Sequence, residues 1–442
     1  MDRYRFLLLT VLLLQPFLAS SQTYWKVANE YGDEILLTLD LNREKSSFEA
    51  YTRKDALKDL AGVFTYALAK AAGKLKYPEI VFIDGKTWNK NDSLLLNGTF
   101  NYFDKQFLFS ASILGNHFNG KYTDQKNRSH PLTGVKVADK KPIRNYESIV
   151  NTAFVITERS LFNSAWLLTD DWKEFKKRVN ELKFKISDDY ELAATFFWLG
   201  KKLPFSPYEM NKKRPDYPSA GRRNRPGIRE VKSGTAFFEA NSIPVNQKDM
   251  DSIAAIITTK GYKKLILDLR GNNRLTPVGA NIIANYLSHK PFCAGVYLTR
   301  RWNDSNKTIP RGGDYQKLFR GFTDKDFRPD GLYKDPGRIL DIVPGKNTFQ
   351  GKVYVLADGK SSKVAEMLIY TLKKEKIATI IGQKTAGITY ISENLMINDE
   401  FDLILPDSDF YTSDGKNLNR IGVEPDIVKS GDETMNYVLG LI

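Results

Sequence analysis

The chain has 442 residues, enough for two or three domains, and its 42% hydrophobic and 27% charged residues are typical of a globular protein. Its 3 histidines and single cysteine, Cys293, give no metal-ligand spacing and exclude an internal disulfide, so we expect neither a metal nor a cofactor. The net charge of +14 favours an anionic partner, such as a cell-surface polymer or a membrane surface, and also fits solubility alone.

Residues 1–21 have the pattern of a secretory signal peptide. Arg3 and Arg5 precede an apolar run over residues 6–14, and small residues at 19–21 suit cleavage near Ser21. The run is too short to remain as a transmembrane helix, and no later segment is long and apolar enough for one. We therefore expect an exported protein, periplasmic or extracellular, without a nucleic-acid partner.

Residues 22–135 are predicted to form a β-rich N-terminal domain, either a small sandwich or a meander. Leu37, Leu39 and Leu41 alternate with polar residues, and Asp84-Gly85 and Asn97-Gly98 are typical of hairpin turns. An Ala-rich stretch over residues 61–74 predicts one helix. The aromatic residues of this domain either line a ligand surface or, as is more common, form core and cross-strand pairs. They are Trp88, Phe100, Tyr102, Phe103, Phe118 and Tyr122.

Residues 143–208 are predicted to form a helical subdomain. Trp172, Phe175 and Val179 make an apolar stripe behind Thr169, which is a good helix cap. Residues 209–231 follow, rich in proline, glycine and basic side chains. We interpret them as an exposed linker, with contact to an anion or acidic peptide as the alternative.

Residues 232–430 are predicted to alternate between buried strands and helices, which gives the chain a mixed α+β and α/β fold class. The central stretch has a strand over residues 352–357, a turn at Asp358-Gly359, a helix that carries Val364 and Leu368, and a strand over residues 377–381. Ser361 or Ser362 is expected to cap this helix. The first turn of such a helix stands over the carboxyl edge of the sheet, where a nucleophile or an anion would sit.

Four short motifs lie at the strand ends and helix starts of this segment. They are Asp268-Leu269-Arg270-Gly271-Asn272, Ala365-Glu366, Gly382-Gln383-Lys384-Thr385-Ala386-Gly387 and Gly422-Val423-Glu424-Pro425-Asp426. Together they resemble the C-terminal processing peptidases, or tail-specific proteases, a serine peptidase family that includes the tricorn core protease. The resemblance covers about residues 143–430 and implies a crotonase/ClpP-like strand–helix core. Many members carry a PDZ domain near residues 209–231, a segment too short to fold one.

At the family's catalytic positions this chain has other residues. The nucleophile position holds Lys363. In the tricorn-like branch the histidine and glutamate positions correspond to Pro207 and Asn419, and the lysine position of the other branch corresponds to Ile388. The glycine pair that helps to build an oxyanion hole is also missing after Asn272. The resemblance therefore implies a member with degenerate catalytic positions.

A binding protein on a peptidase scaffold is the first functional hypothesis. In it, Lys363 holds an anionic group such as the C-terminal carboxylate of a peptide or protein ligand, with Gly271, Asn272 and Arg274 lining the cleft. The alternative for Lys363 is a side chain that points to solvent. The oligomeric state is not predicted.

Two other functions stay open. The first is an active serine-type peptidase that uses Ser362 and a lysine base, for which the candidates are Ser362, Ser361, Lys384 and Ser206. Because neighbouring helix positions point about 100° apart, a hydroxyl at the wrong position is badly aimed. The second is an interaction protein in which the N-terminal β domain binds a surface polymer and the core is only a scaffold.

Overall fold

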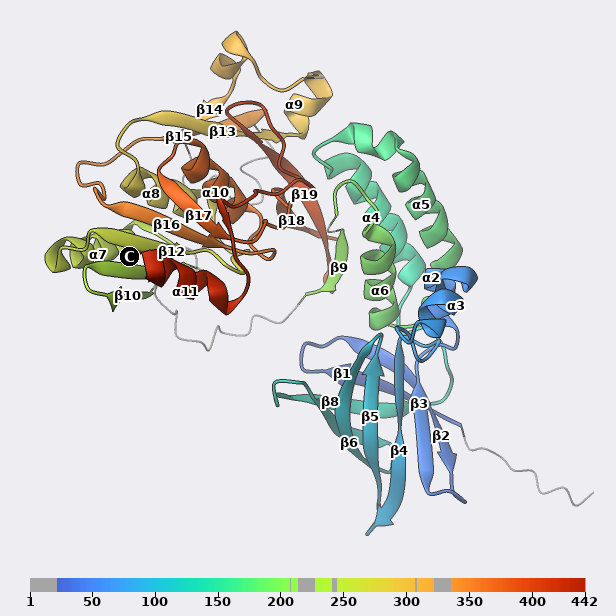
Figure 1. Ribbon diagram of the computed structural model, residues 1–442. Coiled ribbons are helices and arrows are strands. Elements are labelled where there is room, and N and C mark those ends of the chain that lie inside the picture. The colour runs from blue at the N-terminus through green and yellow to red at the C-terminus, as the bar shows by residue number, and fades with distance from the viewer. Residues whose placement is uncertain are drawn as a thin grey trace, which may run out of the picture.

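The computed structural model describes residues 22–206, 208–213, 227–240, 245–306, 308–321 and 335–441. These residues form three parts, an N-terminal β-barrel, a group of helices and a mixed α/β core, which Figure 1 shows in blue, green and yellow to red. The expected signal peptide, residues 1–21, lies outside the described residues. No helix in the described part is both long and apolar enough to cross a membrane.

The N-terminal part is a closed barrel of eight antiparallel strands, in which each strand pairs with the next and β1 also pairs with β8. The strands are β1 Thr23–Asn29, β2 Glu34–Asn42, β3 Ser47–Tyr51, β4 Val81–Lys90, β5 Ser93–Tyr102, β6 Lys105–Leu114, β7 His117–Thr123 and β8 Ser129–Val137. The predicted meander is confirmed and the predicted sandwich is wrong, because one sheet closes on itself around its apolar side chains, among them Trp25, Leu37 and Phe109.

The two glycines predicted to form hairpin turns lie inside strands instead. Gly85 in β4 is directly opposite Gly98 in β5. A Cβ atom on either glycine would overlap backbone atoms of the facing strand, so both positions require glycine for close approach of the two strands.

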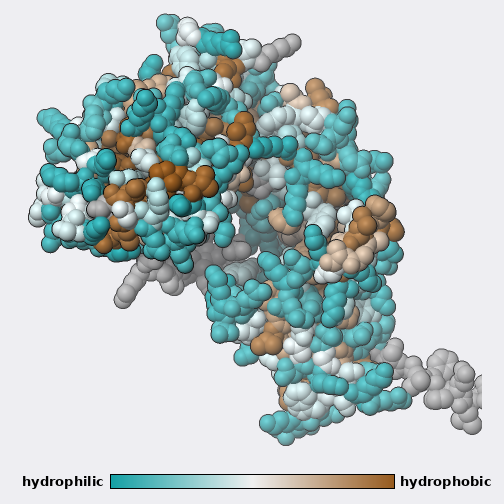
Figure 2. All heavy atoms as spheres, viewed as in Figure 1, coloured by the Kyte–Doolittle hydropathy of each residue, from teal (hydrophilic) through white to brown (hydrophobic). Residues whose placement is uncertain are grey.

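Two helices, α2 (Ala56–Ala61) and α3 (Val63–Ala71), replace the single predicted helix over residues 61–74. The break falls at Gly62, whose φ of 81° is a conformation that favours glycine. α3 leaves Phe64 and Leu68 exposed, and Figure 2 shows a hydrophobic patch over this helix pair.

The helical subdomain consists of α4 (Tyr146–Ser160), the 3₁₀ turn η1 (Ser164–Leu168), α5 (Asp170–Leu182) and α6 (Asp189–Gly200). The predicted stripe and cap are confirmed, because Trp172, Phe175 and Val179 are buried and the Thr169 side chain accepts a hydrogen bond from the Trp172 amide.

Part of the expected linker is folded. β9 (Glu209–Lys212) pairs with the core strand β19 (Phe401–Thr412), and β10 (Gly227–Lys232) pairs with β11 (Thr235–Glu239). Residues 214–226, between β9 and β10, lie outside the described residues.

The core contains two sheets. The first has the order β10-β11-β12-β16-β17-β20, parallel except for β10, and the second has the order β14-β15-β13-β19-β18 with β9 on β19. The remaining strands are β12 Lys264–Asp268, β13 Phe292–Thr299, β14 Phe319–Arg320, β15 Gly337–Ile342, β16 Lys352–Ala357, β17 Ala378–Gly382, β18 Ile391–Met396 and β20 Ile427–Val428. The helices are α7 Gln247–Lys260, α8 Pro277–Leu287, α9 Arg300–Ser305, η2 Gly312–Lys317, α10 Val364–Lys374 and α11 Asp432–Leu441.

The parallel strands position the candidate site. The main apolar cluster of the core joins α7, α8 and α10 to side chains of both sheets, while α11 packs on the opposite face of the first sheet. β12, β16 and β17 are neighbours in register, so they end at one edge of the sheet. The turns that follow them carry Gly271, Lys363 and Gly387.

Candidate functional site

Lys363 stands at a sharp turn between β16 and the helix α10. Its φ is 57° and its ψ is −128°, which is an unfavourable backbone conformation for a residue other than glycine. The Lys363 amide donates a hydrogen bond to the Ile388 carbonyl oxygen, and this contact fixes the turn against the segment after β17. Within the described residues no hydrogen bond or ion pair involves the Lys363 ammonium group, and its side chain is half-buried. The strained position therefore presents an uncompensated positive charge.

The two serines beside Lys363 are not helix caps, which corrects the expectation from sequence. The cap position is Lys363 itself, and no side chain caps the helix. Ser361 is fully buried, and its hydroxyl donates to the Leu269 carbonyl oxygen over 2.8 Å and accepts from the Asp358 amide over 3.0 Å. Ser362 is 8% exposed. The Ser361 hydroxyl thus links two strand ends and is not directed at a substrate.

Glu366 holds the glycine-rich turn that follows β17. Its carboxylate is fully buried and accepts hydrogen bonds from the Thr385 hydroxyl and, over 2.6 Å each, from the amides of Gly387 and Ile388. Burial raises the pKa of Glu366, although these three donors act in the opposite direction. From sequence, Glu366 was only part of the Ala365-Glu366 motif, whereas the structure shows a carboxylate that organises the turn.

Asn419, which the resemblance aligns with a glutamate of the family, makes hydrogen bonds with both the oxygen and the nitrogen of its side-chain amide. Its oxygen accepts from the Thr389 amide over 2.7 Å, and its nitrogen donates over 2.6 Å to the carboxylate of Asp409 in β19. Asp409 is fully buried and also accepts from the side chains of Asn417 and Thr389. Burial raises the pKa of Asp409 to about 6 in spite of these donors.

Asp409 was not among the site residues predicted from the sequence. The signal that could have found it is the run Asp407-Ser408-Asp409 inside an otherwise apolar strand. All three residues are buried.

Three predicted binding residues follow β12. The Gly271 amide donates to the Asp358 carboxylate over 2.9 Å. Asn272 is fully buried, and its side-chain oxygen accepts from the amides of Arg274 and Leu275 over 3.1 and 3.0 Å. The Arg274 side chain is exposed. Asn272 therefore shapes the loop, while the Arg274 side chain is accessible.

Hydrogen bonds connect the turn after β17, which contacts Lys363 through Ile388, to Asn419 and Arg420. Thr389, bonded to Asn419, is two residues from Gly387, and the Gly387 carbonyl oxygen accepts from the Arg420 amide over 2.7 Å. The Arg420 guanidinium donates over 2.8 Å to the Leu203 carbonyl oxygen in the loop after α6. These bonds connect the turn after β17 to the loop before β20 and to the loop after α6.

The remaining candidates do not form a catalytic group in the described residues. Ser206 is half-buried in the loop after α6, and Pro207, expected at the histidine position, lies outside the described residues. The Lys384 ammonium group pairs with the Glu424 carboxylate at 2.8 Å, and both side chains are more than half exposed. Lys384 is thus part of a surface ion pair.

Comparison with known proteins adds a family match. Residues 235–429 match the model of "Peptidase family S41", and this segment contains all four motifs on which the expected resemblance rests. No curated protein sequence matches the chain.

Solved structures show weaker likeness. A candidate peptidase from Parabacteroides merdae is 15% identical with a TM-score of 0.46, and the alignment covers 67% of this chain and 96% of that one. A lipoprotein from Streptococcus agalactiae has 16% identity, a TM-score of 0.43 and coverages of 69% and 98%. The photosystem II D1 C-terminal processing protease has 13% identity, a TM-score of 0.40 and coverages of 67% and 98%. TM-scores this low do not establish a shared fold, so the family match is the finding that identifies the segment.

Proposed function

We propose that the segment matching peptidase family S41, residues 235–429, has lost the family's hydrolytic chemistry and binds the carboxylate of a peptide or protein ligand. The observation that carries the proposal is Lys363 at the strained turn. Its ammonium group has no partner among the described residues and lies at the start of α10, where the helix dipole also favours an anion.

The backbone amides around Lys363 support the loss of hydrolysis. Acyl transfer needs amides aimed at the developing oxyanion, and amides that already donate to protein acceptors are not available for it. Five backbone amides near Lys363 already donate hydrogen bonds to protein acceptors. They are Gly271 to the Asp358 carboxylate, Ser362 to the Asn272 carbonyl oxygen, Lys363 to the Ile388 carbonyl oxygen, and both Gly387 and Ile388 to the Glu366 carboxylate.

Peptide titration tests the proposal. Isothermal titration calorimetry with one unstructured peptide, prepared with a free and with an amidated C-terminus, should give tighter binding for the free acid. Lys363→Ala should weaken that binding by about tenfold to a hundredfold, because a charge-assisted hydrogen bond contributes about 1.5–3 kcal/mol. Lys360→Ala, an exposed lysine in the same turn, is the matched control and should leave affinity unchanged. Equal affinity for acid and amide would refute carboxylate binding.

The peptidase alternative is tested with the same protein. We expect no cleavage of unfolded casein, and therefore no effect of Ser361→Ala, Ser362→Ala, Lys384→Ala or Ser206→Ala. Cleavage that one of these variants abolishes would restore the enzymatic interpretation.

Export is the remaining part of the proposal. Met1 to Ser21 would direct secretion, and the mature N-terminus, measured by mass spectrometry after expression with the leader, should fall near Ser21.

A further inference from the structure

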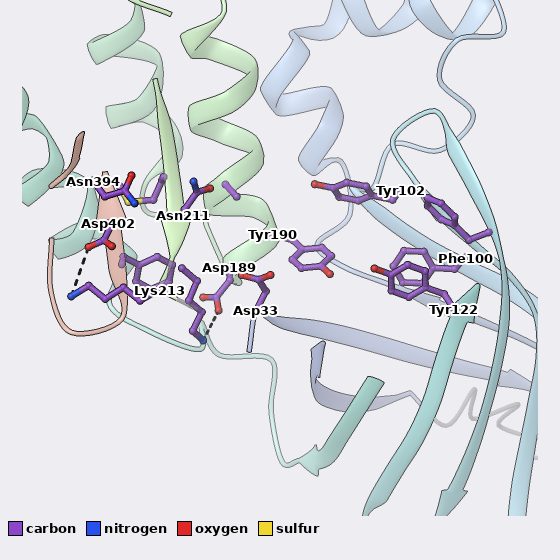
Figure 3. Close-up of a pocket in the computed structure, with 15 residues that line it drawn as sticks. Asp33, Phe100, Tyr102, Tyr122, Asp189, Tyr190, Asn211, Lys213, Asn394 and Asp402 are labelled. Atoms are coloured by element: carbon purple, nitrogen blue, oxygen red, sulfur yellow. Dashed lines mark hydrogen bonds and ion pairs between the residues drawn. The ribbon is translucent and has the colours of Figure 1, made fainter. Parts of the chain in front are cut away.

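A pocket of about 790 Å³ lies where the barrel, α6 and the strands β9, β18 and β19 meet. None of its lining residues belongs to the turns around Lys363. Figure 3 shows aromatic side chains of the barrel on one side and polar side chains of the core strands on the other. Its volume is within the roughly 300–1,000 Å³ that small-ligand sites occupy.

The barrel side of the pocket is an aromatic wall. Tyr122 is stacked between the buried Phe100 and His130, with ring centroids 4.9 and 4.7 Å away, so it offers the pocket its hydroxyl edge. Tyr102 meets Tyr190 of α6 edge-on at 5.5 Å. Figure 3 shows the hydroxyl groups of Tyr102 and Tyr122 directed toward the polar side. Burial raises the pKa of both tyrosines to about 12, so their hydroxyls stay protonated and can donate hydrogen bonds at neutral pH. No other described residue bonds to either hydroxyl.

The core side of the pocket is polar but nearly balanced in charge. Lys212 pairs with Asp189 at 3.0 Å, and Lys213 pairs with Asp402 at 3.7 Å. The third lining carboxylate, Asp33, accepts a hydrogen bond from an asparagine side chain of the barrel. A site of this kind offers no excess positive charge to an anionic polymer. It offers acceptors and donors to a ligand rich in hydroxyl groups.

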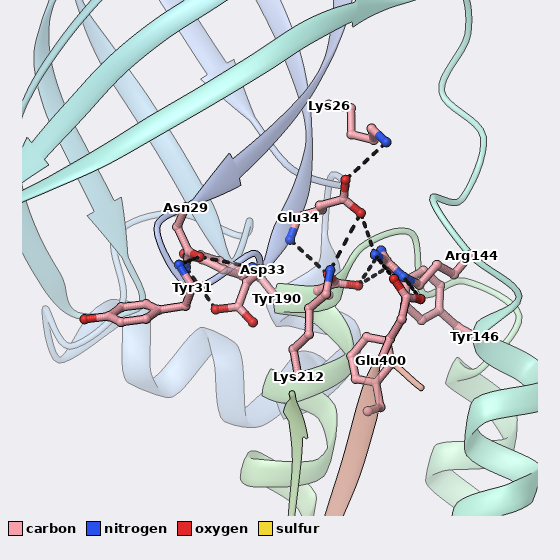
Figure 4. Close-up of polar contacts among 12 residues, drawn as sticks. Lys26, Asn29, Tyr31, Asp33, Glu34, Arg144, Tyr146, Tyr190, Lys212 and Glu400 are labelled. Carbon is pink, nitrogen blue, oxygen red and sulfur yellow. Dashed lines mark hydrogen bonds and ion pairs between the residues drawn. The ribbon is translucent and has the colours of Figure 1, made fainter. Parts of the chain in front are cut away.

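Next to the pocket, ion pairs join all three parts of the molecule. Figure 4 shows Arg144 between Glu34 of the barrel and Glu400 of the core, with N–O distances of 2.5 and 2.7 Å. A third bond, of 2.9 Å, joins Arg144 to Asp189 at the start of α6. These ion pairs connect the two walls directly, and such preorganisation reduces the entropic cost of binding.

We propose that this pocket binds a neutral oligosaccharide. A sugar ring has an apolar C–H face and a rim of hydroxyl groups, so it needs a flat aromatic surface beside hydrogen-bonding groups. The ring of Tyr102 supplies the surface, and the hydroxyls of Tyr102 and Tyr122 donate to sugar oxygens. Asp402 and Asn211 on the opposite wall bond the sugar hydroxyls. This site is independent of carboxylate binding at Lys363.

A glycan array with neutral and acidic oligosaccharides, probed with the full chain, tests the proposal. The best neutral glycan is then titrated by calorimetry against the wild type and the double variant Tyr102→Phe/Tyr122→Phe, which keeps both rings. We expect neutral glycans to bind, and the double variant to bind about tenfold more weakly or worse, because it lacks two hydrogen bonds. Tyr437→Phe, on the remote helix α11, should leave affinity unchanged.

A second variant keeps the test decisive if the double variant folds poorly. Asn211→Trp fills the pocket from its exposed rim and should abolish binding. Binding of acidic glycans only, or of no glycan, would overturn the proposal. So would neutral-glycan binding that Asn211→Trp and Tyr102→Phe/Tyr122→Phe leave unchanged, because the glycan would then occupy another surface.

Discussion

The buried carboxylate of Asp409 makes the stability of this fold depend on pH. It accepts hydrogen bonds from Asn417, Asn419 and Thr389, and its pKa is nevertheless raised to about 6 because burial disfavours its charge. The folded chain therefore binds this proton more tightly than the unfolded chain, in which an aspartate has a pKa of about 3.9. The stabilisation from this proton is complete below pH 4 and is lost as the pH rises to about 6.

Asp409→Asn removes this titration. Between pH 4 and pH 7, the unfolding free energy of the wild type should fall relative to that of the variant by about 3 kcal/mol, which is about 2 pKa units at 1.36 kcal/mol each. Urea denaturation of both proteins at several pH values measures the difference. A difference that stays constant with pH would contradict the raised pKa.

Single residues also show where sequence reasoning reached its limit. The motifs predicted Lys363 at the family's nucleophile position, and the structure shows Lys363 at the sharp turn before α10. The strain at Lys363 and the partner of Ser361 could not be predicted, since both depend on strand ends that are distant in sequence. Ser361 matched a local capping rule, but its hydroxyl bonds to Leu269, which lies 92 residues earlier.

The connection between α10 and the turn after β17 depends on Glu366. Glu366→Ala would leave the Thr385 hydroxyl and the amides of Gly387 and Ile388 without their acceptor. We expect a loss of about 3 kcal/mol or more in unfolding free energy, because each buried donor left unpaired costs about 1–3 kcal/mol. Glu424→Ala, which removes an exposed carboxylate of the same turn region, should cost less than about 1 kcal/mol.

Urea denaturation checks both Glu366→Ala and Glu424→Ala. Hydrogen exchange adds a local readout, because the amides of Gly387 and Ile388 should lose protection in Glu366→Ala even under conditions where the fold persists. Unchanged protection would show that Glu366 does not hold the turn.

Among whole elements, local pattern predicted the core better than the barrel. β16 has the predicted bounds of 352–357, because a buried parallel strand is a continuous apolar run between turn residues. Barrel closure depends on the pairing of β1 with β8, more than 100 residues away, for which the sequence has no local signal. Gly85 and Gly98 matched the hairpin rule, although their role is close approach of two strands.

At the scale of the whole molecule, the sequence predicted the order of the parts but not their junction. The charges that join them are far apart in the chain, and each had the appearance of an ordinary surface residue. Arg144 shows this, because its partners Glu34, Asp189 and Glu400 come from three different parts. Only the folded arrangement reveals that one guanidinium group serves three carboxylates.

Arg144→Met should therefore weaken the junction more than an ordinary surface substitution would. It leaves the buried carboxylate of Asp189 with fewer partners, and breaking such a network costs about 3 kcal/mol or more. Calorimetry should show the barrel and the core unfolding in separate transitions, where the wild type unfolds in one. Lys141→Met removes only an exposed pair with Asp139 and should leave the transition unchanged. Since the pocket also lies at this junction, Arg144→Met should lower the affinity for the neutral glycan. A single unfolding transition in Arg144→Met would contradict the role of Arg144 and would show that apolar packing alone holds the parts together.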